Sequence, residues 1–337
     1  MNHDKRVIQQ NLHECMAGLG TRFLFEQLFR KPQKVMLIGP ACSPDSQAVS
    51  QTAYYWNLIT LSYSAASSAL SNRDEYPYFF RTYVPDAMYN PLRIKILKAF
   101  NWTRVATIHT NFEVFSLAID NLRTLLKQAN ITILASESFG ESPKNQIENI
   151  KASNAYHNGM YGKNYMWILL GWWSKDWWLV DENSKGENLT CTPDELIETV
   201  ASSMYISTEV EQLDLSSKET VAGYTALEIQ KMYQERLQSP EYSDARASGV
   251  DFFGYDAVWS IALTLNTSSA MMDAGFLEDG SMRNLEDFNY DDNEMSSLFF
   301  NVFQDLKFQG ATGHVSFSDA DRVGPTKLEQ LQGKNET

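Results

Sequence analysis

One stretch of the chain, residues 56–108, constrains the fold most, because it alternates between strand and helix patterns. An apolar segment, Ile59–Tyr63, predicts a short buried strand and runs into the small-residue turn Ser64–Ser68. A loop that carries Phe79–Thr82 follows, and a helix with an apolar stripe then leads to a second apolar strand, Val105–Thr110. Strand, helix and strand in one direction form a parallel βαβ unit, so this stretch predicts an α/β sheet.

The small-residue turn follows the carboxyl end of its predicted strand, which is where ligands bind in open α/β sheets. A second loop, Pro40–Ser43, follows another predicted strand, Lys34–Gly39. A hydroxyl at Ser43, beside the free N–H groups at a helix start, would suit a carboxylate. The same serine could be an ordinary helix cap, so the pattern indicates a binding edge and leaves both roles open.

The alternation of strands and helices breaks near residue 152. Residues 151–165 are polar and show no strand, so the apolar strand at residues 165–172 comes about one βα unit too early. The chain has 337 residues, which is too long for one ordinary core, and its length predicts two lobes of ~150 residues each.

Composition argues against several classes of protein. The net charge is −14, from 28 Lys and Arg against 42 Asp and Glu, which argues against nucleic-acid binding. No apolar run approaches the ~20 residues of a membrane-spanning helix, and the first residues lack the apolar core of a signal peptide. Taken alone, these observations favour a cytosolic protein with an acidic surface.

Sequons and cysteines favour the extracellular side instead. N-glycosylation sequons begin at Asn101, Asn130, Asn188, Asn266 and Asn335. Cys15 precedes the first predicted helix and Cys42 follows the next strand, so a disulfide between them could clamp that unit. Cys191 is left over, and three buried free thiols are the alternative to a bridge.

No catalytic constellation stands out in the sequence. The chain lacks G-x-S-x-G, H-E-x-x-H, a phosphate-binding loop and a dinucleotide fingerprint, and its five histidines lie far apart. We therefore expect no enzyme, no metal site and no cofactor, although a site assembled only in three dimensions stays open. Trp172 ends its predicted strand and is expected to face a cleft, whereas Trp167 and Trp177 favour core packing.

Several short motifs occur in the order and spacing of one receptor family. They are Trp56-Asn57-Leu58, Phe79–Thr82, Gly171-Trp172, Tyr255–Trp259, Glu286–Tyr290 and Glu329–Gly333. On these residues the chain resembles the extracellular ligand-binding module of metabotropic GABA type B receptors, which are class C G-protein-coupled receptors. The similarity covers roughly residues 15–148 and 155–333.

The resemblance implies an α/β, two-lobed, periplasmic-binding-protein-like (Venus flytrap) clamshell with parallel sheets flanked by helices. One βα unit would be missing near residue 152 and another before residue 1, which predicts an incomplete chain or, alternatively, a compact variant. We expect lobe 1 over residues 1–140, lobe 2 over residues 141–267, and a return segment over residues 268–337 that ends in a stub toward a membrane domain.

The resemblance also implies a function. In this family an agonist closes the clamshell, and closure is relayed to a seven-helix domain that couples to G proteins. Two different subunits pair, and only one of them binds the transmitter. We therefore expect an extracellular ligand-binding and dimerisation module at the plasma membrane, with G protein reached only through a seven-helix domain outside this chain. A soluble or diverged binding protein for a small amino acid, or a non-signalling fragment or decoy, is the alternative.

The resemblance places the subunit contact on lobe 1. The predicted helix Thr21–Lys31 matches the helix that forms the interface in the family, with Leu24, Phe25 and Phe29 as the expected exposed apolar contacts. The family also pairs the cysteine that matches Cys191 with one on the missing helix, which would leave Cys191 as the odd thiol.

The ligand pocket carried over from the family comprises Ser43, Ala66, Ser67, Tyr83, Trp172 and Asp251. Ser43 matches the serine that grips the ligand carboxylate. Trp172 matches the cleft tryptophan of the second lobe. These two matches imply that part of the pocket for GABA, or for another small amino acid, is present.

The other pocket positions depart from the family pattern. The second ligand-binding serine falls on Ala66, beside Ser67, and the family's histidine falls on Tyr83. The acidic residue that holds the ligand amine falls on Val250, with Asp251 next to it, and the second-lobe tyrosine belongs to the missing strand. A charged group left without its partner costs ~1–3 kcal/mol or more, so we expect binding to be weak or absent, as in the partner subunit.

Overall fold

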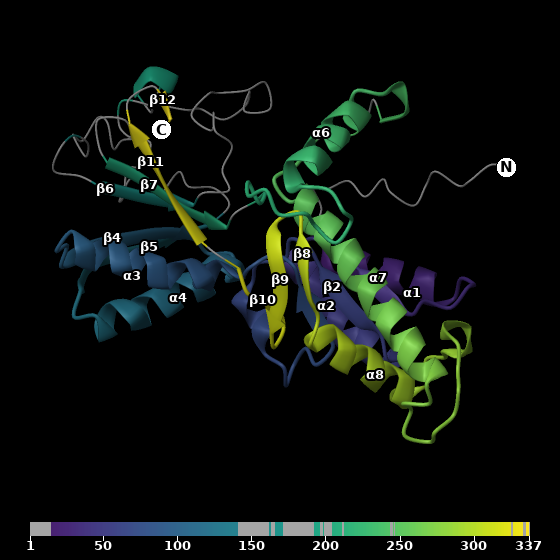
Figure 1. The fold of residues 1–337 in the computed structure, drawn as a ribbon. Helices are drawn as coiled ribbons and strands as arrows, with labels where there is room; N and C mark the ends of the chain where they lie inside the picture. The colour runs from purple at the N-terminus through teal and green to yellow at the C-terminus, as the bar shows by residue number, and fades with distance from the viewer. Residues whose placement is uncertain are drawn as a thin grey trace. The chain divides into compact units, whose positions relative to one another are not determined.

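A computed structural model of the chain divides into two packing units. The structure describes residues 15–140, 162, 166–170, 192–195, 198, 204–210, 212–242, 245, 247–324, 326–332 and 335–336. Unit 1 comprises Met1–Pro85 and Gln212–Val323, and unit 2 comprises Asp86–Glu211 and Gly324–Thr337. The chain therefore passes between the units three times (Figure 1).

Unit 1 is built on a six-stranded sheet. Its strands, in spatial order, are β1 (Met36–Ile38), β2 (Ile59–Ser62), β3 (Phe79–Arg81), β10 (Asp321–Arg322), β9 (Gly313–Ser318) and β8 (Lys307–Gly310). The first four strands run parallel, and β10, β9 and β8 are joined by antiparallel pairing. The strand β2 is buried along its whole length, as expected for a strand with parallel neighbours on both sides.

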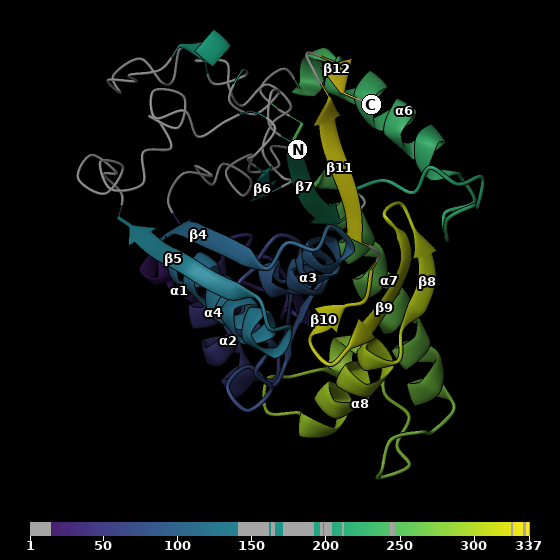
Figure 2. The same cartoon turned by 90° about the vertical axis from the view of Figure 1, so that its left-hand side faces the viewer.

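Unit 1 contains five α-helices within its described residues. They are α1 (Ala17–Leu28), α2 (Ser43–Ala53), α6 (Ala226–Leu237), α7 (Asp251–Asp273) and α8 (Asn293–Gln304). Buried residues of α8 recur at helical spacing, at Met295, Phe299 and Phe303, and the Phe303 ring lies 4.5 Å from that of Phe80 on β3. The helix α8 lies beside α7 in both views (Figure 2). None of the helices in the described ranges is long and apolar enough to cross a membrane.

Unit 2 contains two further sheets. One is the parallel pair β4 (Arg104–Thr110) and β5 (Thr132–Phe139). The other has the order β12 (Asn335–Glu336), β11 (Thr326–Gln332), β7 (Met204–Val210) and β6 (Met166–Leu170), with β6 and β7 parallel. The helices α3 (Asn90–Ala99) and α4 (Glu113–Gln128) pack with their neighbours around Ile94, Leu97, Leu122, Leu126 and Ile131.

The predicted class, a parallel α/β fold with flanking helices, is confirmed, but one predicted unit is wrong. The strands at Ile59–Ser62 and Arg104–Thr110 do not belong to one βαβ unit, because β2 pairs with β1 and β3 whereas β4 pairs with β5. The motif Phe79–Thr82, expected in a loop, supplies the missing neighbour as β3. The reason is that α3 buries its apolar face against α4 and not against β2.

The chain first leaves unit 1 after Pro85, and α3, β4, α4 and β5 then pack among themselves in unit 2. It returns to unit 1 at Gln212, and α7 shares the core of unit 1 through Ala257 and Met272. The lobe bounds expected at residues 140 and 267 stay predictions.

Candidate ligand-binding site

The loops that follow β1 and β2 meet at the hydroxyl of Ser43. This residue begins α2, and its Oγ accepts hydrogen bonds from the backbone N–H groups of Ala66 (3.1 Å) and Ser67 (3.0 Å). Both bonds use lone pairs of the oxygen, and within the described residues no acceptor takes its hydroxyl hydrogen. Ser43 is therefore held in place by the turn and can still donate to a ligand.

Two neighbouring serines fix the backbone around this contact. The Ser62 hydroxyl donates to the carbonyl of Pro40 (2.7 Å) and accepts from the Ala65 N–H (3.1 Å). The Ser46 hydroxyl donates to the same Pro40 carbonyl (3.0 Å). The chain can turn sharply out of β1 because Gly39 adopts a φ of +86°, which residues with a side chain rarely tolerate.

A buried guanidinium holds the small-residue turn through its backbone carbonyls. Arg81 of β3 is fully buried, and its Nη1 donates to the carbonyls of Ala65 (2.9 Å) and Ser67 (2.8 Å). Its Nε donates to Asp321 of β10 (2.7 Å), and its Nη2 donates to Ser71 (2.6 Å). A buried charge needs a partner and hydrogen bonds for its remaining donors, and Arg81 has both.

A second cluster lies at the start of α7. The ring of Tyr83 is almost fully buried and meets the Phe253 ring edge-on at 5.1 Å. The Thr82 hydroxyl donates to the Phe253 carbonyl (2.9 Å), so the segment after β3 is anchored to the first turn of α7. Burial, and to a lesser extent the charge of Asp251, raises the pKa of Tyr63, so this phenol stays protonated.

The carboxylate of Asp251 is already used within the chain. Its Oδ2 accepts from the Tyr233 hydroxyl (2.7 Å) and the Ser248 N–H (2.6 Å), and its Oδ1 accepts from the Ser248 hydroxyl (2.9 Å). Burial together with the bond to Asp251 raises the pKa of Tyr233 to about 12. Asp251 thus stabilises the start of α7, where a negative charge is favourable.

The predicted ligand residues are only partly brought together. Ser43, Ala66 and Ser67 meet, but the Ser67 side chain is 1% exposed and accepts from the Ala69 N–H (3.2 Å) as a helix cap. Trp172 lies outside the described residues. Tyr63, which directly follows β2, was not among the expected ligand residues, although it follows the same strand as the small-residue turn.

The disulfide expected from the cysteine positions is confirmed. Cys15 and Cys42 are bridged, with their Cα atoms 5.6 Å apart. Since Cys42 directly precedes Ser43, the bridge ties the start of α1 to the start of the candidate site. Cys191 lies outside the described residues.

The surface of α1 agrees with the expected apolar contact only in part. Phe29 is 84% exposed, and Phe25 is 37% exposed and meets the Trp56 ring edge-on at 5.7 Å. Leu24 was expected on the surface, but it is 4% exposed because it points into the core of unit 1. Tyr55, which the sequence did not single out, is exposed just after α2.

Three predicted sequon asparagines lie at exposed positions. Asn101 and Asn130 follow the ends of α3 and α4 in the left-handed conformation, with φ of 54° and 57°. Asn266 is exposed on α7. Asn188 lies outside the described residues, and Asn335 is part of β12.

Comparison with known proteins gives a consistent assignment. Residues 10–155 and 150–334 match the family described as "Receptor family ligand binding region", and the two matched segments meet where the sequence pattern breaks. The chain is 32% identical to gamma-aminobutyric acid type B receptor subunit 1 of Mus musculus, over 95% of this chain and 34% of that protein. It is 29% identical to subunit 1 of Caenorhabditis elegans, over 95% of this chain and 36% of that protein, and 27% identical to subunit 2 of Homo sapiens, over 96% and 35%.

The chain spans about a third of the length of the curated relatives it matches. These relatives are named as receptor subunits and not as enzymes. The match to the family covers nearly the whole chain, and the α/β architecture with its parallel sheets agrees with it. The chain therefore belongs to the family of receptor ligand-binding regions.

Proposed function

We propose that this chain is the extracellular ligand-binding and dimerisation module of a GABA type B-like receptor subunit at the plasma membrane. The observation that carries the proposal is the Ser43 hydroxyl, which two backbone N–H groups hold at the start of α2 with its hydrogen free to donate. A helix start with a fixed hydroxyl suits the carboxylate of a small amino acid such as GABA. Signalling would follow from ligand-dependent closure, relayed to a G protein by a seven-helix domain.

The side of the pocket that should hold the ligand amine is altered. Val250 has no charge to offer, and both oxygens of Asp251 already accept hydrogen bonds from neighbours. Ala66 lacks a hydroxyl, and Ser67 caps the turn. A hydrogen bond to a charged group contributes ~1.5–3 kcal/mol, so each lost partner weakens binding by about one to two orders of magnitude. Roles for Tyr83, as a neutral donor, and for Trp172 stay predictions.

Pairing with a second subunit is the other half of the proposal. The relatives include both subunit 1 and subunit 2 of the same receptor type, which supports a heterodimeric partnership. On unit 1, Phe25 and Phe29 at α1 and Tyr55 just after α2 are exposed aromatic side chains of the kind that suits such a contact. N-linked glycans at the exposed positions Asn101 and Asn130 would be expected on the secreted chain.

Calorimetric titration of the secreted, glycosylated chain with GABA tests whether the altered pocket positions weaken ligand binding. We expect no binding, or binding only at millimolar GABA. Micromolar binding that is lost in Ser43→Ala, but kept in the surface control Ser217→Ala, would overturn this part of the proposal.

A thermal-shift panel of small amino acids tests the alternative class of protein. If a compound other than GABA stabilises the chain and Ser43→Ala removes the effect, the chain is a binding protein for that compound. A uniform absence of shifts would leave dimerisation as the main role, which mixing with a type B subunit and measuring mass by light scattering would check.

A further inference from the structure

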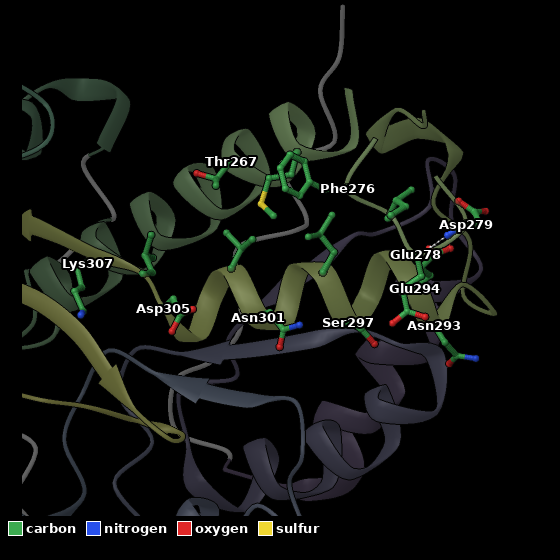
Figure 3. A pocket seen from close by; sticks show the side chains of 15 residues that line it. Thr267, Phe276, Glu278, Asp279, Asn293, Glu294, Ser297, Asn301, Asp305 and Lys307 are labelled. Atoms are coloured by element: carbon green, nitrogen blue, oxygen red, sulfur yellow. Dashed lines mark hydrogen bonds between the residues drawn. The ribbon is translucent and has the colours of Figure 1, made fainter. Parts of the chain in front are cut away.

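Unit 1 carries a groove that shares no residue with the candidate ligand-binding site. It runs between the C-terminal half of α7 and the helix α8, and its volume is about 1030 Å³ (Figure 3). Small-molecule sites usually occupy roughly 300–1,000 Å³, so the groove is large enough for an organic ligand.

The middle of the groove is apolar. Leu298 and Val302 stand one helical turn apart on α8, and Met271 of α7 and Leu306 add to this apolar lining. Ser297 and Asn301 of α8 also line the groove. Phe276, on the loop between the helices, also lines the groove and is 67% exposed. A ligand that covers this aromatic side chain would remove its apolar surface from water, which favours binding.

One end of the groove is strongly acidic. Glu278, Asp279 and Glu294 line this end. Arg283 pairs with Asp279 and Glu294, and also with Asp292. These three carboxylates share one guanidinium and Glu278 adds a fourth negative charge, so this end carries three negative charges in excess. At the opposite end Asp305 and Lys307 offset one another.

The arginine at the acidic end is not free to receive an anion. Arg283 contacts Asp292 at 2.9 Å, Glu294 at 3.1 Å and Asp279 as well, so its charge is already matched. The carboxylate of Glu278, in contrast, has no partner within the described residues and lines the groove beside Phe276. The field at this end of the groove thus attracts a cation and repels an anion.

We propose that the groove between α7 and α8 binds an organic cation with an apolar body. The apolar part lies along Phe276, Leu298 and Val302, and the ammonium group meets Glu278 and the neighbouring carboxylates. This site goes beyond the proposed function, because it needs neither Ser43 nor the small-residue turn.

The test uses three probes that differ only in the head group: 4-phenylbutylamine, 4-phenylbutan-1-ol and 4-phenylbutyrate. Binding to the full secreted chain is measured by ligand-observed NMR titration. We expect the amine to bind with a dissociation constant near or below the millimolar range, and the acid to bind at least tenfold more weakly. Equal affinities for all three probes, or no binding of the amine up to its solubility limit, would overturn the proposal.

Two groove variants and one matched control locate the site. Phe276→Ser and Glu278→Gln should each weaken amine binding at least threefold. Glu278→Gln should also reduce the difference in affinity between the amine and the alcohol. Met282→Ser should leave binding unchanged, because Met282 is an exposed apolar residue on the same loop that does not line the groove. If Phe276→Ser impairs folding, Glu278→Gln at an exposed carboxylate still decides the question, and unchanged amine binding in that variant counts against the site.

Discussion

Replacing Gly310 by alanine should destabilise unit 1, because no space exists for a Cβ at this position. Gly310 ends β8, and an added Cβ would lie 2.6 Å from Cγ of Asp256 on α7. Carbon atoms pack best at about 3.5–4.0 Å, so the overlap is close to 1 Å and one group has to move. Asp256 is fully buried, which leaves it little freedom to do so.

The size of this destabilisation follows from the hydrogen bonds that the Asp256 carboxylate accepts. Its Oδ1 accepts from the Ala311 N–H (2.7 Å), and its Oδ2 accepts from the Thr312 N–H (3.0 Å) and the Thr312 hydroxyl. Displacing the carboxylate strains or breaks these bonds, and a buried donor left unsatisfied costs about 1–3 kcal/mol. Overpacking alone costs about 1–3 kcal/mol, so we expect a total loss near 3 kcal/mol.

Urea unfolding followed by circular dichroism measures this loss, with Gly18→Ala as the matched control. Nothing lies within 4 Å of a Cβ at Gly18 in α1, so that exchange should stabilise the chain by roughly 0.5–1 kcal/mol through helix propensity. The same change of glycine to alanine should therefore lower the unfolding free energy at position 310 and raise it at position 18. A Gly310→Ala variant within 0.5 kcal/mol of the parent would refute the reasoning about the packing of Asp256.

Three further predictions follow from single contacts. Burial raises the pKa of Asp45, whose Oδ1 has no partner among the described groups, so Asp45→Asn should raise the melting temperature at pH 7 and leave it unchanged below pH 4; an equal gain at pH 3 would contradict this. Hydrogen bonds from Ser281, with help from Arg283, lower the pKa of Asp279 to about 2. Asp279→Asn should therefore melt at a lower temperature than the parent above pH 4, and the difference should vanish as the pH falls to 2. A difference that stays constant with pH would argue against this. The bridge between Cys15 and Cys42 closes a loop with a sequence separation of 27, so Cys15→Ala should lower the unfolding free energy by ~3.5 kcal/mol, and an unchanged value in non-reducing urea melts would exclude that loop effect.

Much of the framework could be predicted from local pattern. The helices at Ala226–Leu237 and Asn293–Gln304 follow from apolar spacing, and the disulfide follows from where the cysteines stand relative to the first helix and strand. The pairing of strands could not be predicted in the same way, since β3 has only three residues, Phe79–Arg81, and its pattern is too short to tell from a loop. Its pairing with β10 also joins segments 240 residues apart, which no local pattern reports.

The candidate site was predictable in position but not in geometry. The carboxyl ends of parallel strands indicated the loop at Ser43 and the turn at Ala66, because ligands bind at that edge. The bond between the Ser43 hydroxyl and the turn depends on the packing of two loops that are distant in sequence. The carboxylate of Asp251 is taken up by Tyr233 of α6 and by Ser248, just before α7. A reading of residue types cannot supply such pairings.

The small-residue turn is held through its backbone, so its side chains can vary without loss of the fold. Arg81 binds the turn through the carbonyls of Ala65 and Ser67, and Ser43 binds it through the N–H groups of Ala66 and Ser67. All four contacts are made to the backbone, so the side chain at position 66 does not contribute to them. A hydroxyl there can be replaced by a methyl group at little cost to the fold, while a ligand that needs the hydroxyl loses a partner. Replacing Arg81, in contrast, removes a donor from the carbonyls of Ala65 and Ser67 and the charged partner of Asp321, so this position tolerates less change than position 66.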